Sequence, residues 1–316
     1  MQIRRLGQTD LSIAPLVFGG NVFGWTADKA TSFDLLDRFV GAGLNAIDTA
    51  DVYSAWAPGN KGGESETIIG EWLKARGKRD DVVIITKVGS EMGPGKKGLR
   101  AAYIEKAVEA SLRRLQIDAI DLYLAHFPDT STPHEETLTA FAKLKRAGKI
   151  RWHGCSNYSA QQLQDSFEVA KANGLARFEV LQPEYNLYDR AKYEGALRDL
   201  CIAEGLGVIT YFSIAKGFLS GKYHSEADLG QSPRGAAAKS YLNPRGFRIL
   251  DALAAVAGRH GAKSADVALA WLVQRPGVTA PIASATKAAQ LESLINGARL
   301  QLTPSDVAEL DTAAAP

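Results

Sequence analysis

The sequence predicts an α/β protein that folds as one (β/α)8 TIM barrel over residues 1–316. Short β-branched runs alternate with amphipathic helices almost throughout, the units are evenly spaced, and the composition does not change near the middle. A length of 316 residues suits one such domain, since barrels of about 250 residues or more are common. A doubly wound open sheet could be built from the same units, and the even spacing favours the barrel.

Eight runs along the chain are candidate strands. Several are apolar at consecutive positions, as strands covered on both faces require. The runs are Leu16–Phe18, Asn45–Asp48, Val82–Thr86, Ile120–Leu124, Ile150–Gly154, Val180–Gln182, Val208–Tyr211 and Thr279–Ile282. The last run contains Pro281, which has no N–H to donate, so we expect strand pairing to lapse there.

The segments between these runs have helical periodicity. Apolar residues recur at three- and four-residue steps, for example between Ile104 and Leu115. Thr132–Glu135 and Ser159–Gln162 have the pattern of capping boxes, the first with Pro133 at the opening helical position. These signals place a helix after each predicted strand for most of the chain.

One long stretch, Tyr223–Gly246, has neither periodicity. It is rich in Gly, Ala, Ser and Pro. A loop of this length inside a compact domain usually carries function, so we expect a mobile loop that lies over a binding site at the barrel mouth.

Composition excludes several classes of protein. Lys and Arg number 37 against 35 acidic residues, with no long run of either sign, so no broad nucleic-acid footprint is present. Two cysteines 46 positions apart, Cys155 and Cys201, indicate neither a disulfide framework nor a metal site. No apolar stretch approaches the ~18 residues of a membrane span, and Met1–Asp10 does not resemble a secretory signal. We expect a cytoplasmic protein without a membrane partner, and its oligomeric state stays open.

Polar side chains follow three successive predicted strands, where catalytic groups of a barrel lie. Asp48 ends the second strand, with Tyr53 five residues further on, Lys87 ends the third, and His126 follows the fourth. A free phenol, with a pKa near ~10, is a weak acid at neutral pH. A neighbouring ammonium would lower that pKa, and a carboxylate would hold the ammonium in place. We therefore predict that Tyr53 donates a proton to a carbonyl oxygen that His126 orients.

Several motifs resemble those of the aldo-keto reductase family over essentially the whole chain. In pattern the chain is most similar to bacterial members that resemble potassium-channel β subunits and aryl-alcohol dehydrogenases. The matching stretches are Asn45–Tyr53, Gly63–Glu66, Ile85–Lys87, Ile120–His126, Gly154–Asn157 and Gly217–Tyr223. The resemblance implies a (β/α)8 barrel and assigns Asp48, Tyr53, Lys87 and His126 to the family's catalytic tetrad.

The resemblance also implies a nicotinamide cofactor, NADPH or NADP+, bound without a Rossmann domain. Ser156, Asn157 and Gln182 match residues that hold the carboxamide, and Tyr211 matches the aromatic residue that stacks on the nicotinamide ring. Lys287 is the clearest cation near the expected 2′-phosphate, which favours NADP and leaves NADH open. The further matches to cofactor-binding positions are Gly20, Asn21, Asp48, Phe212, Ser213, Ile214, Ala215, Gly217, Leu219, Lys222, Ser284, Thr286, Lys287 and Gln290.

The predicted function is the reversible reduction of an aldehyde or ketone to an alcohol, with Tyr53 as general acid. We expect the small-molecule carbonyl or alcohol substrate to contact Trp25, Trp56, His126 and Phe127. One alternative is a cofactor-binding regulatory or sensor subunit with little turnover. A second is a Schiff-base lyase with Lys87 as nucleophile, which needs a neutral amine beside Asp48.

Overall fold

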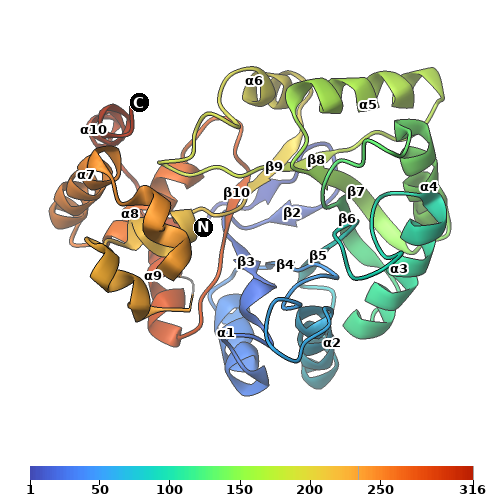
Figure 1. Ribbon diagram of the computed structural model, residues 1–316, viewed down its shortest axis with the longest axis horizontal. Helices are drawn as coiled ribbons and strands as arrows, with labels where there is room; N and C mark the ends of the chain where they lie inside the picture. The colour runs from blue at the N-terminus through green and yellow to red at the C-terminus, as the bar shows by residue number, and fades with distance from the viewer. Residues whose placement is uncertain (234, 316) are drawn as a thin grey trace.

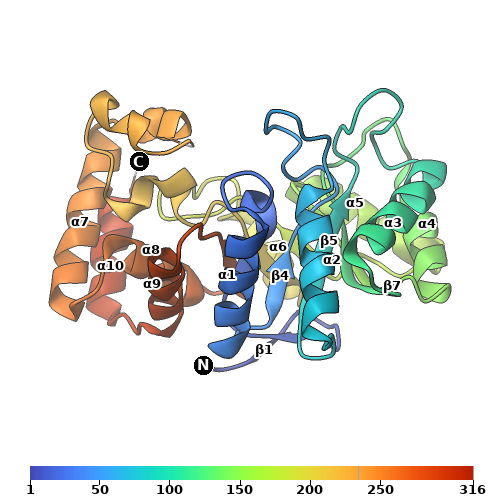
Figure 2. The same ribbon diagram turned by 90° about the horizontal axis from the view of Figure 1, so that it is seen from below.

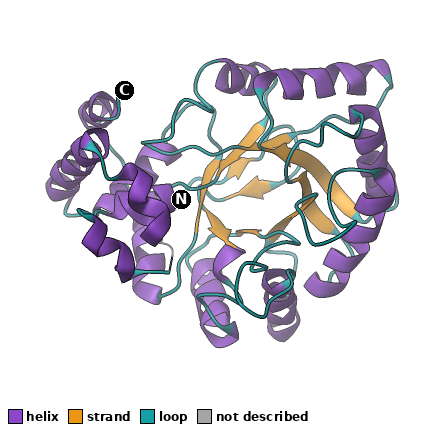
Figure 3. Cartoon of the chain, viewed as in Figure 1, coloured by secondary structure: helices purple, strands orange, loops and turns teal. Residues whose placement is uncertain are grey.

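The computed structural model describes residues 1–233 and 235–315 and has a closed barrel of parallel strands at its centre. Figure 1 shows the barrel with helices around it, and Figure 3 separates the strands from that outer layer. The last strand pairs with both its predecessor and the first barrel strand, which closes the ring. The (β/α)8 prediction is confirmed. Arg234 and Pro316, which the predicted loop and domain include, lie outside the described residues.

Each predicted run overlaps one barrel strand. The strands are β3 (Val17–Gly19), β4 (Ala46–Asp48), β5 (Val83–Val88), β6 (Ile120–Ala125), β7 (Ile150–Ser156), β8 (Val180–Gln182), β9 (Gly207–Thr210) and β10 (Ala280–Ala283). Pairing does not lapse at Pro281, which is in register with Thr210 of β9. That expectation was wrong because a residue can keep its place in a parallel ladder without donating to it.

Helices cover the outside of the barrel. They are α1 (Lys29–Gly41), α2 (Glu64–Arg76), α3 (Ala101–Leu115), α4 (His134–Arg146), α5 (Ala160–Ala172), α6 (Ala196–Ala203), α7 (Pro244–His260), α8 (Ser264–Val273), α9 (Ala288–Arg299) and α10 (Pro304–Ala313). The capping box at Ser159 is confirmed. The one at Thr132 is wrong, because Thr132 Oγ1 donates to Asp129 Oδ2 and Pro133 is itself the N-cap. Within the described ranges, no helix has the length and apolar content needed to cross a membrane.

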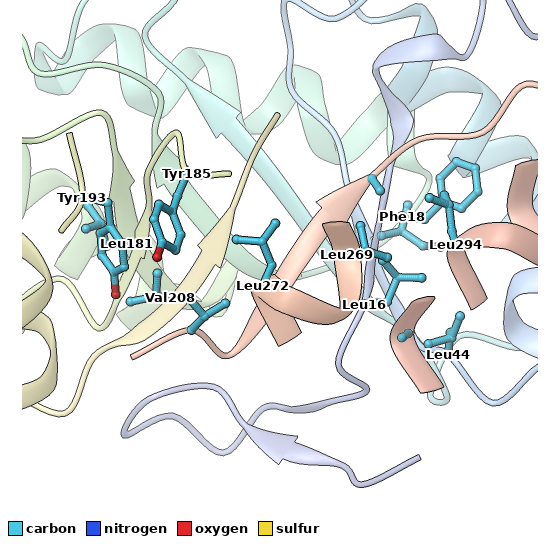
Figure 4. Packing of buried hydrophobic residues seen from close by; sticks show 14 of the residues in the cluster. Leu16, Phe18, Leu44, Leu181, Tyr185, Tyr193, Val208, Leu269, Leu272 and Leu294 are labelled. Atoms are coloured by element: carbon cyan, nitrogen blue, oxygen red, sulfur yellow. The ribbon is translucent and has the colours of Figure 1, made fainter. Parts of the chain in front are cut away.

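The apolar core has two parts. One fills the barrel, where Val17, Ile85 and Leu122 meet residues of an amino-terminal hairpin, β1 (Arg4–Arg5) and β2 (Ser12–Ile13). The other lies between strands and helices, and Figure 4 shows its members Val208 and Leu272. Figure 2 places β1 and the N-terminus at the end of the molecule opposite the long loops, so the hairpin closes the bottom of the barrel. The mouth is left for a binding site.

The stretch between Tyr223 and Gly246 is less irregular than its composition suggests. It contains two 3-10 helices, η3 (Glu226–Gln231) and η4 (Gly235–Tyr241), and α7 begins within it at Pro244. Tyr241 is buried and its hydroxyl donates to Asp189 Oδ2 at 2.7 Å. Buried aromatic anchors of this kind explain why a Gly- and Ala-rich segment adopts local helical turns.

Gly70 allows α2 and α3 to approach closely. A Cβ at this position would lie 2.1 Å from the carbonyl oxygen of Arg114 at the end of α3. We expect Gly70→Ala to destabilise the protein by about 1–3 kcal/mol, because backbone rather than a flexible side chain must move. Gly258→Ala in α7 is the control: its Cβ meets nothing within 4 Å, so it should stabilise the protein by about 0.5–1 kcal/mol. Urea unfolding of both variants measures the difference, and equal stabilities would contradict this account of α2–α3 packing.

Candidate active site

The carboxyl ends of β4, β5 and β6 bring the four predicted catalytic side chains together. Asp48 is the last residue of β4, Lys87 lies near the end of β5, and His126 directly follows β6. Tyr53 lies in the turn after β4, and its hydroxyl is 2.8 Å from Lys87 Nζ. These strands are neighbours in the parallel barrel, so residues 39 positions apart meet at one rim.

Lys87 uses all the donors that an ammonium has. Its Nζ lies 2.7 Å from Asp48 Oδ2, 2.8 Å from the carbonyl oxygen of Thr49 and 2.8 Å from the Tyr53 hydroxyl. An ammonium carries three N–H groups, so three acceptors match the charged form. The Tyr53 oxygen therefore accepts from Lys87 and keeps its own proton to donate. Lys87 is completely buried, which leaves no free amine to attack a carbonyl as the lyase alternative requires.

Both carboxylate oxygens of Asp48 accept hydrogen bonds. Gln182 Nε2 donates to Oδ1 at 2.8 Å, and Oδ2 faces Lys87 and, at 3.3 Å, the Tyr53 hydroxyl. Ser156 Oγ in turn donates to the carbonyl oxygen of Gln182 at 2.7 Å. The carboxylate is thus fixed from two sides of the barrel, and it fixes Lys87.

The charge environment of Tyr53 differs from the sequence-based expectation. Burial, followed by the charge of Asp48, raises the pKa of Tyr53 well above its usual value near 10. Burial lowers the pKa of Lys87. The Lys87 ammonium does not offset the effect of burial on Tyr53, whose pKa stays raised. Tyr53 is therefore protonated at neutral pH, the form that a general acid needs. The contact with Lys87 stabilises the phenolate only once the proton has left.

His126 presents a neutral imidazole to the same site. Burial, and then the charge of Lys87, holds the pKa of His126 well below its usual value of 6.5. The ring stacks on Phe127 with centroids 4.9 Å apart, and Ser90 Oγ lies 3.1 Å from Nδ1. A neutral imidazole can donate one hydrogen bond to an oxygen without carrying charge.

A buried glutamate of α2 contacts the residue next to Lys87. Glu66 is completely buried and accepts from Thr86 Oγ1 and Arg114 Nε, both at 2.6 Å. Its neighbour Ser65 donates to the carbonyl oxygen of Gly20 at 2.7 Å and lies 2.8 Å from Thr49 Oγ1. The motif Gly63–Glu66 therefore joins α2 to three strand ends rather than touching the site.

A cavity of about 810 Å³ opens at this rim. Tyr53 and His126 line it, whereas the buried Lys87 is not part of the lining. The predicted cofactor residues that line it are Asn21, Asp48, Ser156, Asn157, Gln182, Tyr211, Phe212, Ser213, Ile214, Gly217, Lys222, Ser284, Thr286 and Gln290. Four predicted residues, Gly20, Ala215, Leu219 and Lys287, are not part of the lining. The volume lies within the range of about 300–1,000 Å³ that is usual for ligand sites.

Aromatic side chains form the wall near Tyr53. The rings of Trp25 and Trp56 meet edge to face with centroids 5.7 Å apart, and the centroid of the Trp56 ring lies 6.0 Å from that of Tyr53. Trp56 and Phe127 are each 48% exposed. The predicted substrate residues Trp25, Trp56, His126 and Phe127 all line the cavity.

The cavity also reaches the starts of α8 and α9. Lys263 lines it there, together with Ala265 and Gln290, whereas Lys287 is exposed outside it. The backbone N–H of Lys263 donates to Asp266, which also accepts from Ser293 of α9. Lys263 is thus a further cation near these helix starts, and the role predicted for Lys287 stays a prediction.

The loop after β9 has an unusual backbone. Phe212, Ala215 and Lys216 have φ values of 54°, 45° and 57°, a region that side-chain-bearing residues seldom adopt. Such strain is concentrated at functional sites. Phe212, Ile214 and Lys216 all line the cavity.

Among the residues of this site that sequence reasoning missed are Lys263, which lines the cavity, and Ser90, which contacts His126. Ser90 follows β5 by two residues, so its position after a predicted strand was a usable signal. Lys263 precedes a helix and carries no signal in the sequence. In the described part of the chain, no cluster of three or more His, Cys, Asp or Glu residues could hold a metal ion.

The fold and the site together define a (β/α)8-barrel protein with a hydrogen-bonded tyrosine, lysine and aspartate cluster beside a cavity of about 810 Å³. A model of the Aldo/keto reductase family matches residues 15–315, and the chain belongs to this family. Family membership makes it an oxidoreductase.

Similar proteins include one named as an aldo-keto reductase and one named as a probable channel subunit. The chain is 33% identical to "Aldo-keto reductase YhdN" of Bacillus subtilis, with 96% of this chain and 88% of that protein covered. It is 31% identical to "Protein tas" of Escherichia coli, covering 98% and 97%. It is also 34% identical to a "Probable voltage-gated potassium channel subunit beta" of Oryza sativa, covering 92% and 89%.

Proposed function

We propose that this protein is an NADPH-dependent carbonyl reductase in which Tyr53 protonates the oxygen of an aldehyde or ketone. The observation that supports this most directly is that Lys87 Nζ is hydrogen-bonded to Tyr53 and Asp48, which both line the cavity. His126, a neutral donor beside Tyr53, orients the carbonyl oxygen. When bound, the reduced nicotinamide supplies the hydride.

The residues along the cavity fit a dinucleotide. Near Tyr53, the amide oxygen of Gln182 accepts no hydrogen bond from the described residues and is available to a carboxamide N–H. Tyr211 is held by a 2.7 Å hydrogen bond from its hydroxyl to Asn157 Oδ1, which fixes a flat surface for the ring. Three lysines also line the cavity and offer the cations that bind phosphate groups: Lys216, Lys222 and Lys263.

The protein's own groups perform the proton transfer. As hydride reaches the carbonyl carbon, charge develops on the oxygen, and Tyr53 gives its proton to that oxygen. An alkoxide is far more basic than a phenolate, so a phenol of raised pKa still donates. The Lys87 ammonium then stabilises the phenolate oxygen at 2.8 Å. In the oxidation of an alcohol, the same groups act in the reverse protonation states.

A panel of carbonyl substrates tests this function. We expect steady consumption of NADPH with aromatic aldehydes or ketones, followed by the absorbance of the reduced nicotinamide. The relative named as a channel subunit supports a second candidate, a cofactor-binding regulatory subunit. A regulatory subunit predicts at most one turnover per bound cofactor, so sustained turnover would exclude it. Absence of sustained turnover with every substrate would contradict the reductase.

Lys263 is the residue that we expect to distinguish NADP from NAD. Lys263→Met should weaken binding of NADP+ about tenfold or more, because a charge-assisted contact with the 2′-phosphate is lost, and should leave NAD+ binding unchanged. Lys287→Met is the matched control, since Lys287 is exposed outside the cavity. Fluorescence titration of both variants with both nucleotides measures the effect. An effect of Lys287→Met alone would restore the assignment made from the sequence.

A further inference from the structure

Ser90 holds a position that the proposed mechanism has not used. It follows β5 and Gly89, whose φ of 112° turns the chain over the end of the barrel. The backbone N–H of Gly98 donates to the carbonyl oxygen of Gly89 at 3.0 Å and secures this turn. As a result, Ser90 Oγ lies 3.1 Å from Nδ1 of His126, which follows the neighbouring strand β6.

Among the described residues, Ser90 is the one side chain that is hydrogen-bonded to a ring nitrogen of His126. The backbone N–H of His126 donates to Val88 at 2.8 Å, and its carbonyl oxygen accepts from Asn157 at 2.9 Å. Phe127 stacks on the ring at an interplanar angle of 11°. These contacts fix the backbone and the plane of the ring, but none of them decides which ring nitrogen carries the proton.

The proton must be on Nε2 for His126 to orient a carbonyl. A neutral imidazole has one N–H and one bare nitrogen, and a carbonyl oxygen only accepts. If the proton were on Nδ1, Nε2 would present a lone pair to the carbonyl oxygen and repel it. A hydroxyl that donates to Nδ1 satisfies the bare nitrogen and leaves the proton on Nε2.

We propose that Ser90 is a positioning residue that donates its hydroxyl proton to His126 Nδ1 and so holds His126 as the Nε2–H tautomer for the carbonyl. This inference rests on the proposed function, because only a carbonyl acceptor makes that tautomer the productive one. Ser90 acts through His126 and does not itself line the cavity.

The kinetic test uses Ser90→Ala with Ser90→Thr as the matched control. Ser90→Ala should lower kcat for carbonyl reduction about tenfold and leave cofactor affinity unchanged, whereas Ser90→Thr, which keeps the hydroxyl, should retain most of the activity. In a His126→Ala background, Ser90→Ala should have no further effect. Unchanged activity of Ser90→Ala, or an equal loss in the His126→Ala background, would overturn the proposal.

Nitrogen NMR of the imidazoles is an independent readout. In the wild-type complex with NADP+, His126 should show a protonated Nε2 and a bare Nδ1, and Ser90→Ala should give a mixture of tautomers. A wild-type His126 protonated mainly at Nδ1 would overturn the role of Ser90. This measurement needs no turnover, so it separates failure of the Ser90 proposal from failure of the reductase function, which the substrate panel detects.

Discussion

Tyr53→Phe is expected to lower the rate of hydride transfer by about 10²–10⁴-fold, the usual contribution of a positioned general acid. The change removes one oxygen, which accepts from Lys87 at 2.8 Å and carries the proton that the substrate receives. NADPH binding should be unchanged, because Gln182, Tyr211 and the cations of the cavity are untouched. Single-turnover measurements with NADPH and an aromatic aldehyde give the rate, and fluorescence titration gives the affinity.

Tyr103→Phe is the matched control for this prediction. Tyr103 lies on α3, is partly buried and does not line the cavity. Its loss of a hydroxyl should leave the hydride-transfer rate unchanged. If Tyr53→Phe transferred hydride at nearly the wild-type rate while still binding NADPH, the general acid would have to be another group.

The second large effect is expected for Lys87→Met, which removes the cation from the cluster. Phenolate formation at Tyr53 would lose its stabilising charge, so we expect hydride transfer to fall by about 10²–10⁴-fold. Stability should also fall, by about 3–5 kcal/mol, because the buried carboxylate of Asp48 loses its partner 2.7 Å away.

A double variant separates the two consequences of this change. Lys87→Met combined with Asp48→Asn leaves no unpaired buried charge, so thermal unfolding should show partial recovery of stability. Activity should stay low, because the ammonium is still absent. Recovery of activity together with stability would mean that Lys87 is only structural.

The strands were predictable because a barrel strand is buried on both faces and so appears in the sequence as a consecutive apolar run. Val83–Val88 and Ile120–Ala125 are buried along their whole length and were predicted to within two residues. The β1–β2 hairpin was not predicted, because two-residue strands are too short to have a periodicity. Likewise, local turns between Tyr223 and Gly246 depend on tertiary anchors such as the Tyr241–Asp189 hydrogen bond.

For the site, the sequence predicted which residue types meet but not the balance of their charges. Asp48, Lys87 and His126 end or follow successive strands, so their convergence follows from the parallel barrel. The direction of the Tyr53 pKa depends on burial, which no spacing of residues reveals. The presence of Lys263 in the cavity lining has a similar cause, since it depends on how α8 and α9 pack at the cavity.

The most direct test that Tyr53 donates the proton is the pH dependence of reduction with an altered phenol at position 53. A general acid must be protonated, so activity is present below its pKa and lost above it. Because the pKa of Tyr53 is raised, the reduction rate of the wild type should be flat through neutral pH and fall only in the alkaline range. A fluorinated tyrosine at position 53 is a more acidic phenol, so we expect the alkaline fall in the reduction rate to move to lower pH. A fall that stays at the wild-type pH would contradict Tyr53 as the proton donor.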